Sequence, residues 1–448
     1  MNTPDSILNI LDAWSDPGRD VHRLATLLFP ICRSITGNGV RDTLDILARH
    51  IPLTPYEVPS GTQVFDWTVP PEWNIRDAYI KDHTGRKLVD FQQSNLHVLG
   101  YSTPVHGTFS REDLLPHLIT LPEQPEAIPY RTSYYNRTWG FCLPHRLAES
   151  LGPGPFEVHI DADFNDHGSL TYGECLLPGA SQDEILISTH ICHPSLANDN
   201  CAGLATACLL AHHLQGHTLP LSVRFLFIPG TIGAITWLAR NEAHARNHIR
   251  HGIVLSCIGD PAPPVYKRSR QGNAPVDQTL AYVLNQLHPD AHRIEPFSPY
   301  GYDERQFCSP GFNLPVGLLM RSKYGEFPQY HNSLDNLDFI TPAAIQQTIR
   351  ILVHALHALL ENRVMVNQLP NCEPQLGKRG LYSAIGGDKD RYQKQMAMLW
   401  LLNQSDGAQS LLDIAETSGI AFPILVQTAR LLQEHGLLQP AHSTHPDR

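Results

Sequence analysis

The sequence predicts an α/β core, interrupted by a mostly β module and followed by a C-terminal winged-helix module. Three observations predict this. Apolar strand-like runs alternate with helical runs between residues 184 and 362. Short β-like runs rich in proline and aromatic residues fill residues 55–172, and three short helical patterns follow residue 380. Apolar strands that alternate with helices are typical of a sheet covered by helices on both faces.

The N-terminal segment is expected to supply helices to the core. Apolar residues recur at helical spacing in segments 6–14, 21–30 and 40–51. The glycine-rich run RSITGNG at 33–39 separates the last two segments. It lacks the preceding strand and the spacing of a phosphate-binding loop, so it is only a weak candidate for one.

The core itself is expected to alternate strand and helix. We expect its strands at residues 184–190, 222–229, 252–259 and 314–321, and its helices at 200–214, 231–244, 274–287 and 341–362. Ligands bound by such sheets gather at the carboxyl ends of the strands. The stretches STHICHPS, IGDP and PQYHNSLDN lie at or after strand ends, so we expect them to form one site.

The predicted domains are residues 1–54 and 173–378 for the core, 55–172 for the inserted module and 379–448 for the winged helix. In the insert, HTGR between two alternating runs predicts a hairpin. The last module has helical patterns at 392–407, 410–419 and 421–438. Its candidate recognition helix carries only Arg430 as a cation, beside Glu434, whereas DNA readers need several cations. Packing, or formation of a homo-oligomer through this module, is therefore favoured over DNA binding.

Composition narrows the class of protein. The chain has 448 residues, 42% of them hydrophobic, and a net charge of −11, which argues against a nucleic-acid coat or a membrane-surface binder. No apolar run is long enough to span a bilayer, and the N-terminus lacks the features of a secretory signal. The nine cysteines form no CxxC pair, as in a protein with reduced thiols. We therefore expect a cytoplasmic protein without a membrane segment.

The stretch STHICHPSLANDNCAG, residues 188–203, is the first candidate metal site. His190 ends a predicted strand, and Asp199 precedes a predicted helix. Imidazole nitrogen and carboxylate oxygen from separate loops are typical zinc ligands. A simpler interpretation makes Asp199 an ordinary helix N-cap and His190 a hydrogen-bonded strand-end residue. Both interpretations fit the pair alone.

Further polar residues follow the later strands. Asp260 follows the strand at 252–259 and could equally be a turn residue before proline. His331 lies in the polar loop PQYHNSLDN, and the acids Asp303 and Glu304 precede the strand at 314–321. Together these residues favour a site assembled from several strand ends.

The order of these motifs resembles the zinc aminopeptidase superfamily, which includes leucyl-type aminopeptidases, glutamate carboxypeptidases and glutaminyl cyclases. The signatures HICHPSLANDN, TIGAI and YHNSLDN are similar, more narrowly, to aminopeptidase-like proteins often encoded near polysaccharide-biosynthesis genes. The resemblance covers nearly the whole chain. It implies a zinc-aminopeptidase-like mixed sheet, an inserted small β domain and a C-terminal winged helix.

The resemblance also implies a partial site. His190 matches the first histidine ligand, Asp199 the aspartate that bridges two zinc ions, and His331 the late histidine ligand. Two departures stand out. Cys192 occupies the place of an aspartate that orients a ligand, and the paired glutamates, one of them the general base, are replaced by Gly230 and Thr231.

These departures favour one zinc ion over two, because the missing glutamates include a ligand of the second ion. Three protein ligands and an open position are typical of catalytic zinc. Asp260, Asp303 or Glu304 would then accept the proton of the attacking water. His193 is either a substitute ligand, an acid/base residue or a simple loop histidine, and Cys192 is expected to pack rather than act as a nucleophile.

Substrate contacts are expected from two regions. The run RTSYYNRTWGFCLPH combines arginines with aromatic residues, which suits a carboxylate or a flat polar ligand, although the same aromatics could simply pack the insert. Near His331, two further residues are candidates. The candidate substrate-binding residues are Arg131, Tyr135, Arg137, Trp139, Arg321 and Tyr330.

Two functions are consistent with this pattern. The first is a zinc-dependent hydrolase that cleaves an amide bond in a small peptide, an aminoacyl conjugate or a sugar conjugate. The second is a catalytically degenerate metal-binding module that binds a sugar or peptide in a biosynthetic or regulatory assembly. The first is the preferred interpretation, whereas the absent glutamate pair and Cys192 are the features that favour the second.

Overall fold

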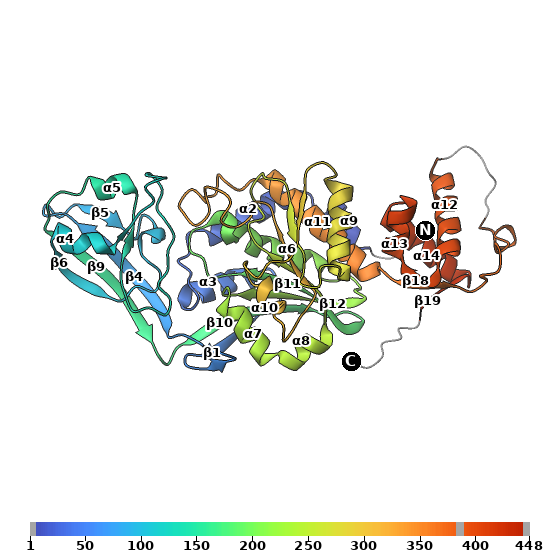
Figure 1. Ribbon diagram of the computed structural model, residues 1–448, viewed down its shortest axis with the longest axis horizontal. Coiled ribbons are helices and arrows are strands. Elements are labelled where there is room, and N and C mark those ends of the chain that lie inside the picture. Colours follow the sequence, from blue (N-terminus) through green and yellow to red (C-terminus); the bar gives the residue numbers. More distant parts are fainter. Residues whose placement is uncertain (1–5, 382–388, 442–448) are drawn as a thin grey trace. The chain divides into compact units, whose positions relative to one another are not determined.

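The computed structural model describes residues 6–381 and 389–441. The chain divides into two compact units, Met1–Val353 and His354–Arg448. Figure 1 shows the helices and strands of each unit.

The first unit is built on a mixed sheet of eight strands. Their spatial order is β1 (Thr54–Pro59), β10 (Ser169–Leu177), β12 (Leu221–Ile228), β11 (Ser181–His190), β13 (Ile249–Leu255), β16 (Val316–Met320), β14 (Val265–Lys267) and β15 (Arg293–Glu295). The neighbours β12, β11, β13 and β16 are parallel, whereas β10 pairs antiparallel to β12 and β14 antiparallel to β16. The four parallel strands therefore bring their carboxyl ends to one edge.

Helices cover both faces of this sheet (Figure 1). Helix α6 (Ala202–Leu214) packs against β10, β11, β12 and the N-terminal helix α2 (Pro17–Leu28). On the opposite face lie α7 (Ile232–Arg240) and α8 (Glu242–His248). The single helix expected at 231–244 is thus two helices, because Asn241 has a non-helical backbone conformation with φ −124° and ψ 27°. The remaining core helices are α3 (Asn38–Leu47), α9 (Pro275–Leu287) and α11 (Pro342–Glu361).

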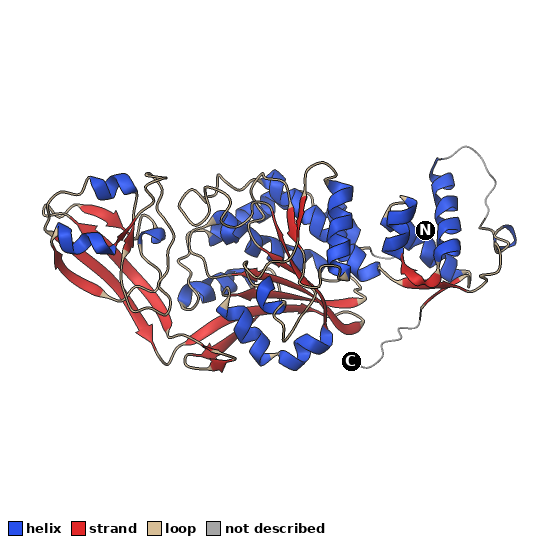
Figure 2. Ribbon diagram, in the orientation of Figure 1, coloured by secondary structure: helices blue, strands red, loops and turns tan. Residues whose placement is uncertain are grey.

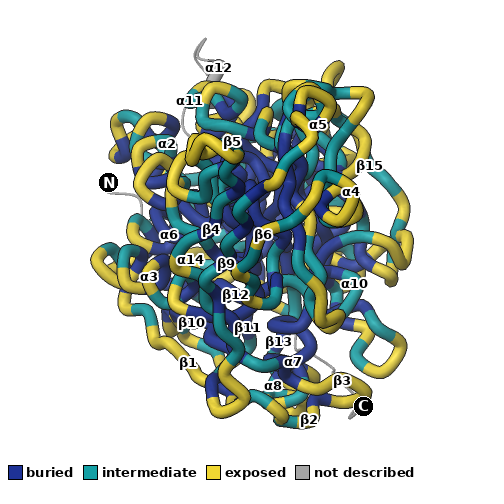
Figure 3. Tube along the Cα trace, turned by 90° about the vertical axis from the view of Figure 1, so that its left-hand side faces the viewer, coloured by how far each residue is buried: buried dark blue, intermediate teal, exposed yellow. Residues whose placement is uncertain are grey.

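The predicted alternation of strands and helices is confirmed, and so is the prediction that helices cover both faces of the sheet. The central strands are almost entirely buried (Figure 3). Helix α6 is buried on nearly every side, which explains why its sequence is apolar throughout rather than amphipathic.

The inserted module contains a four-stranded antiparallel sheet. Its order is β5 (Lys87–Asp90), β4 (Glu72–Lys81), β9 (Phe156–Asn165) and β6 (Val105–Phe109). The hairpin predicted at HTGR joins β4 to β5 through a turn closed by the N–H of Asp82 and the carbonyl of Arg86, at 3.0 Å. The chain leaves the main sheet at β1 and returns at β10, so the predicted limits 55 and 172 fall within these two strands.

The second unit combines a three-stranded sheet with helices α12 (Lys389–Gln404), α13 (Leu411–Ser418) and α14 (Phe422–Glu434) (Figure 2). The sheet order is β18 (Asp406–Ser410), β17 (Val364–Asn367) and β19 (Leu438–Pro440). Strand β17 lies upstream of residue 379, the predicted start of this module. Arg430 on α14 forms an ion pair of 2.7 Å with Glu361. The one cation of the candidate recognition helix is therefore paired with a carboxylate.

No helix in the described part of the chain is long and apolar enough to cross a membrane.

Candidate metal centre

Three histidines and one aspartate meet at the carboxyl edge of the parallel strands. His190 is the last residue of β11, His193 lies in the loop that follows it, and Asp199 lies in the turn before α6. His331 comes from the loop after β16. The Nε2 atom of His190 lies 2.8 Å from Oδ1 of Asp199, and Nε2 of His331 lies 3.1 Å from Oδ2. The sequence therefore predicted correctly that these distant stretches meet.

The spacing of the donor atoms suits a metal ion. Nε2 of His193 lies 3.3 Å from Nε2 of His331 and 3.8 Å from Oδ2 of Asp199. A tetrahedral zinc with ligands at about 2.0–2.1 Å places those ligands about 3.3 Å apart. The donor atoms of His190, His193 and Asp199 also lie within 4.8 Å of one another. Imidazole nitrogen and carboxylate oxygen are donors that zinc accepts, so this set fits the ion.

The charge state of the cluster also suits a metal ion. Asp199 is completely buried. Burial raises its pKa, but His193 and His190 outweigh burial, and the pKa lies well below its ordinary value. Burial lowers the pKa of His193 well below its ordinary range. The lowered pKa values of Asp199 and His193 both favour the unprotonated donors that ligation requires.

Three polar side chains hold the aspartate in place. Asp335 accepts the backbone N–H groups of Asn198 and Asp199, at 2.6 and 2.9 Å. Tyr302 donates its hydroxyl to Oδ2 of Asp199 at 2.6 Å, and its ring stacks on His190 with 4.6 Å between centroids. Asp260 accepts the side-chain amide of Asn198 at 2.9 Å. Such partners orient metal ligands in proteins.

Arg33 fixes the loop that carries His193. Its guanidinium is buried and donates to the carbonyl of His193 at 2.8 Å and to that of Leu28 at 2.6 Å. It also reaches the carbonyl of Pro194 at 3.3 Å and the sulfur of Cys201 at 3.1 Å. The run RSITGNG thus supplies an arginine that joins both ends of the ligand loop, and no phosphate site is needed to explain it.

The inserted module contributes a wall of the centre. The N–H of Tyr130 donates to the carbonyl of His331 at 2.8 Å, and the N–H of Ser333 donates to the carbonyl of Ile128 at 2.9 Å. The ring of Tyr130 lies 5.0 Å from the ring of His193 and 5.1 Å from that of His331. His331 has a φ of +56°, which is unusual for a residue other than glycine. The strand-like contact with the insert stabilises that conformation.

A buried carboxylate without a partner lies next to the centre. Asp303 is completely buried, and neither of its carboxylate oxygens has a hydrogen-bond partner among the described residues. Burial raises its pKa well above the ordinary value, and the neighbouring Glu304 raises it further. A Cβ atom added to Gly230 would lie 3.5 Å from Oδ1 of Asp303 and 3.2 Å from Cβ of His190. The carboxylate therefore borders the space that a side chain at position 230 would occupy.

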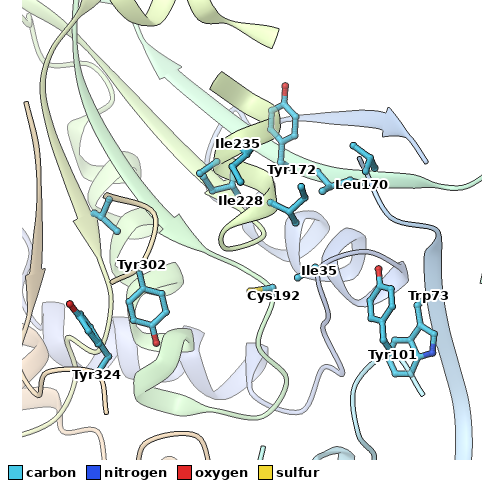
Figure 4. Packing of buried hydrophobic residues seen from close by; sticks show 14 of the residues in the cluster. Ile35, Trp73, Tyr101, Leu170, Tyr172, Cys192, Ile228, Ile235, Tyr302 and Tyr324 are labelled. Atoms are coloured by element: carbon cyan, nitrogen blue, oxygen red, sulfur yellow. The ribbon is translucent and has the colours of Figure 1, made fainter. Parts of the chain in front are cut away.

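Cys192 is a packing residue in this structure. It is buried in the apolar cluster that also contains Ile35 (Figure 4), and burial raises the pKa of its thiol to about 12. A thiol with such a pKa is a poor nucleophile at neutral pH. This agrees with the sequence-based preference for packing.

The remaining predicted site residues divide into two groups. Tyr330 belongs to the centre, since its ring stacks on His331 at 3.9 Å and its hydroxyl lies 3.1 Å from that of Tyr302. Arg131, Tyr135 and Arg137 lie exposed in the segment of the insert that follows Tyr130.

Four candidates are held by protein partners of their own. Asp260 accepts hydrogen bonds at both oxygens, including one of 2.8 Å from the hydroxyl of Ser322. Glu304 forms a buried ion pair of 2.7 Å with Lys267. Arg321 donates to the carbonyl of Ala344 and to Gln347, and Trp139 stacks on His117 within the insert, at 3.6 Å. These bonds give the four residues structural roles.

Sequence reasoning missed Tyr302, Tyr130 and Arg33. Tyr302 stands directly before Asp303 in the motif YDERQF, so it could have been considered with that acid. Tyr130 and Arg33 reach the centre through tertiary contacts that no local pattern reveals.

Comparison with known proteins settles the family. Residues 22–362 match the family model described as a domain of unknown function, DUF4910, and residues 363–440 match a winged helix-turn-helix model. This chain belongs to the DUF4910 family.

Two relatives from Clostridium acetobutylicum match nearly the whole chain. A candidate polysaccharide biosynthesis protein with an aminopeptidase-like domain from Clostridium acetobutylicum is 47% identical over 425 residues, which cover 95% of this chain and 97% of the relative. The crystal structure of a candidate peptidase from the same species superposes with a TM-score of 0.89 at 45% identity, and covers 97% of this chain and 98% of that one.

More distant structures share the fold alone. The zinc aminopeptidase BSAP from Bacillus subtilis superposes with a TM-score of 0.56 at 10% identity, and covers 80% of this chain and 96% of that one. The predicted fold class, an aminopeptidase-like α/β core with a C-terminal winged helix, is thus confirmed.

We predict that Arg33→Met weakens zinc binding by about 10- to 100-fold, because the loop that carries His193 loses the donor that fixes its carbonyl groups. Competition with a chelator of known affinity measures this change. Arg41→Met is the matched control, because Arg41 binds Glu57 and Glu72 rather than the ligand loop. Equal zinc affinity in the Arg33 variant and in wild type would show that the hydrogen bonds of Arg33 do not contribute to zinc binding.

Proposed function

We propose that this protein is a metal-dependent hydrolase of aminopeptidase-like type, which cleaves an amide bond in a small peptide or aminoacyl conjugate. The observation that carries the proposal is the convergence of three imidazole Nε2 atoms on the buried carboxylate of Asp199. His190 lies 2.8 Å from Oδ1, whereas His331 and His193 lie 3.1 and 3.8 Å from Oδ2, so both oxygens of the carboxylate have imidazole neighbours close enough to share a bound ion. The names of the C. acetobutylicum relatives, which mention an aminopeptidase-like domain and a candidate peptidase, support this class of reaction.

The proposed ligands are His190, Asp199 and His331. A zinc ion at this position supplies a Lewis acid that polarises a carbonyl group and lowers the pKa of water to about 7. His193 is the fourth donor. Because a catalytic zinc keeps one open position, we assign His193 to proton transfer at its Nε2 atom, 3.3 Å from Nε2 of His331.

Asp303 is the proposed general base. The sequence supplies no glutamate at positions 230 and 231, but the carboxylate of Asp303 lies 3.5 Å from the place that a Cβ of residue 230 would take. A buried carboxylate that no protein group neutralises has a high proton affinity, as a base for a neutral-pH reaction requires. Its oxygens are also free to accept a hydrogen bond from a reacting molecule, since they have no partner among the described residues.

Tyr330 is placed to stabilise negative charge on the substrate. Its ring stacks on His331, and its hydroxyl is held 3.1 Å from that of Tyr302. A phenol donor at a partly exposed position beside the ligands can donate to an oxygen that gains charge during attack.

A second function is favoured by the same four donors. If all four side chains bound one ion, the tetrahedral shell would be closed, as in structural zinc sites. The protein would then be a metal-stabilised module that binds a sugar or peptide without turnover. The number of ligands distinguishes the two functions.

The partners in this proposal are small molecules. Nucleic acid is not among them, because Arg430 of the candidate recognition helix forms an ion pair with Glu361. A homo-oligomer through the C-terminal module stays a prediction, as does a cytoplasmic location.

We predict that the purified protein binds one zinc ion per chain and that His190→Ala reduces zinc to well below one equivalent and abolishes amide hydrolysis. His193→Ala should keep the zinc and lose at least about 100-fold in kcat, the usual size of an acid/base contribution. Elemental analysis and assays with aminoacyl-amide substrates measure both quantities.

The control is His97→Ala, which removes a buried histidine bonded to the carbonyl of Cys142 in the insert. It should keep zinc and activity. Loss of zinc in the His193 variant would make the shell a closed one and favour the second function. Full hydrolytic activity of the His190→Ala variant would contradict both proposed functions.

We also predict opposite effects at two adjacent acids. Asp303→Asn should reduce kcat by at least about 100-fold at unchanged zinc content, and should raise stability at neutral pH by about 1 kcal/mol or more, because burial disfavours ionisation of this acid in the folded protein relative to the unfolded chain. Glu304→Gln should destabilise the protein, because Lys267 loses its buried partner. Denaturant unfolding and steady-state kinetics test both variants.

The stability difference has a defined pH dependence. The pKa of Asp303 is raised in the folded state, so the folded protein binds this proton more tightly than the unfolded chain. The wild type therefore loses stability relative to Asp303→Asn as the pH rises above the unfolded pKa of about 3.9. A pH-independent difference, or an active Asp303→Asn enzyme, would exclude Asp303 as the base.

A further inference from the structure

Two half-exposed aromatic side chains face each other on the surface of the first unit. Trp67 and Tyr135 are 47% and 49% exposed. Their ring centroids are 5.8 Å apart, and the ring planes are inclined by 52°. Large aromatic side chains that contact each other while half of their surface faces water often mark a binding surface.

Tight turns hold both residues outward. Trp67 begins β3 (Trp67–Thr68), which pairs with β2 (Gln63–Val64), and the hairpin is anchored by buried Val64 and Val69. Its turn contains Phe65 at a φ of +55°, a conformation that favours glycine or asparagine over a bulky residue. The turn that carries Tyr135 is closed by the N–H of Asn136 and the carbonyl of Ser133, at 2.9 Å.

The same segments border the metal centre. Tyr130, which packs against His193 and His331, lies five residues before Tyr135. Tyr134 points inward, because it packs against the core cluster that contains Cys192, and burial raises its pKa. Strand β2 packs against α7, the helix that follows Gly230. Tyr135 therefore follows a segment that contacts the centre, and the hairpin of Trp67 packs against the helix that begins two residues after Gly230.

Unpaired cations accompany the aromatic pair. Arg131 and Arg137 flank the turn of Tyr135 and are exposed, and neither forms an ion pair with a described residue. The guanidinium of Arg137 lies over the ring of Phe164, 3.7 Å from its centroid, which limits the directions that it can take. In a chain with a net charge of −11, an exposed arginine two residues from Tyr135 that forms no ion pair with a described residue favours an anionic ligand.

We propose that Trp67, Tyr135 and Arg137 form a subsite for an acidic sugar, a pyranose ring that bears a carboxylate. The C–H face of the ring stacks on the aromatic pair, and the carboxylate pairs with the guanidinium. The proposal rests on the proposed function in one respect: the sugar is the part of the conjugate that lies outside the metal centre.

The geometry favours a sugar over a nucleotide base. A flat base held between two rings needs parallel planes about 7 Å apart, twice the usual contact distance of about 3.5 Å. The rings of Trp67 and Tyr135 are closer than that and inclined by 52°. They offer no parallel slot for a flat base, whereas a puckered ring can pack its C–H groups on their exposed parts.

Isothermal titration of the full chain with a trimer of galacturonic acid tests the subsite, with maltotriose as the neutral probe and uridine monophosphate as the nucleotide probe. We expect the acidic trimer to bind more tightly than either. Trp67→Ala and Tyr135→Ala should each weaken it about tenfold, and Arg137→Gln should remove the preference over maltotriose. Phe65→Asn is the matched control, since Phe65 lies in the same hairpin, is 48% exposed and contacts Phe312 instead. It should leave binding unchanged.

The titration is repeated with His190→Ala, which lacks a metal ligand. Binding that survives in this variant supports the subsite whether or not the protein hydrolyses amides, so the two proposals fail separately. The subsite is excluded by absence of binding at millimolar trimer, by trimer binding that Trp67→Ala does not weaken, or by tighter binding of uridine monophosphate that depends on Trp67.

Discussion

The buried carboxylate of Asp199 is the group around which the site is organised. An ionised carboxylate without exposure to water is costly unless opposite charge or hydrogen bonds compensate it. Here two imidazoles reach Oδ1 and Oδ2 at 2.8 and 3.1 Å, and the hydroxyl of Tyr302 adds a bond of 2.6 Å. The parallel strands, the turn before α6 and the His331 loop all have to meet at this point. A metal cation is the compensation that such a donor set suits best.

The centre depends on two parts of the chain that are far apart in sequence. The core supplies the ligands, while the insert holds the His331 loop through backbone hydrogen bonds from Tyr130 and to Ile128. The insert therefore does more than extend the surface, because it fixes one ligand loop and carries the exposed pair Trp67 and Tyr135.

The missing glutamates also have a structural consequence. With glycine at position 230, the space beside His190 lacks a side chain, and Asp303 from another loop borders it. A carboxylate supplied from a different place in the chain can preserve the chemistry after its usual position is lost. The cost is an unpaired buried acid, and such a cost is typical of functional rather than structural groups.

Much of the fold could be predicted from the sequence because its strands are uniformly apolar and its helices regular. The meeting of His190, Asp199 and His331 was also predictable, since parallel strands share an edge. The break at Asn241 was not, because nothing in the pattern of residues 231–244 ends a helix there. The sequence leaves Trp139 open as a pocket or a packing residue, because aromatic side chains that pack and those that bind look alike in sequence. Tyr130 and Arg33 depend on contacts between segments more than 100 residues apart, which local patterns do not encode.

Zinc K-edge X-ray absorption of the protein loaded with one equivalent of zinc tests the metal centre most directly. Nitrogen and oxygen ligands at about 2.0–2.1 Å, with the scattering of at least two imidazoles and no sulfur at about 2.3 Å, are the expected result. A zinc–sulfur distance would place the metal at cysteine instead, and a shell of water oxygens alone would show that Asp199 and its histidines hold no ion.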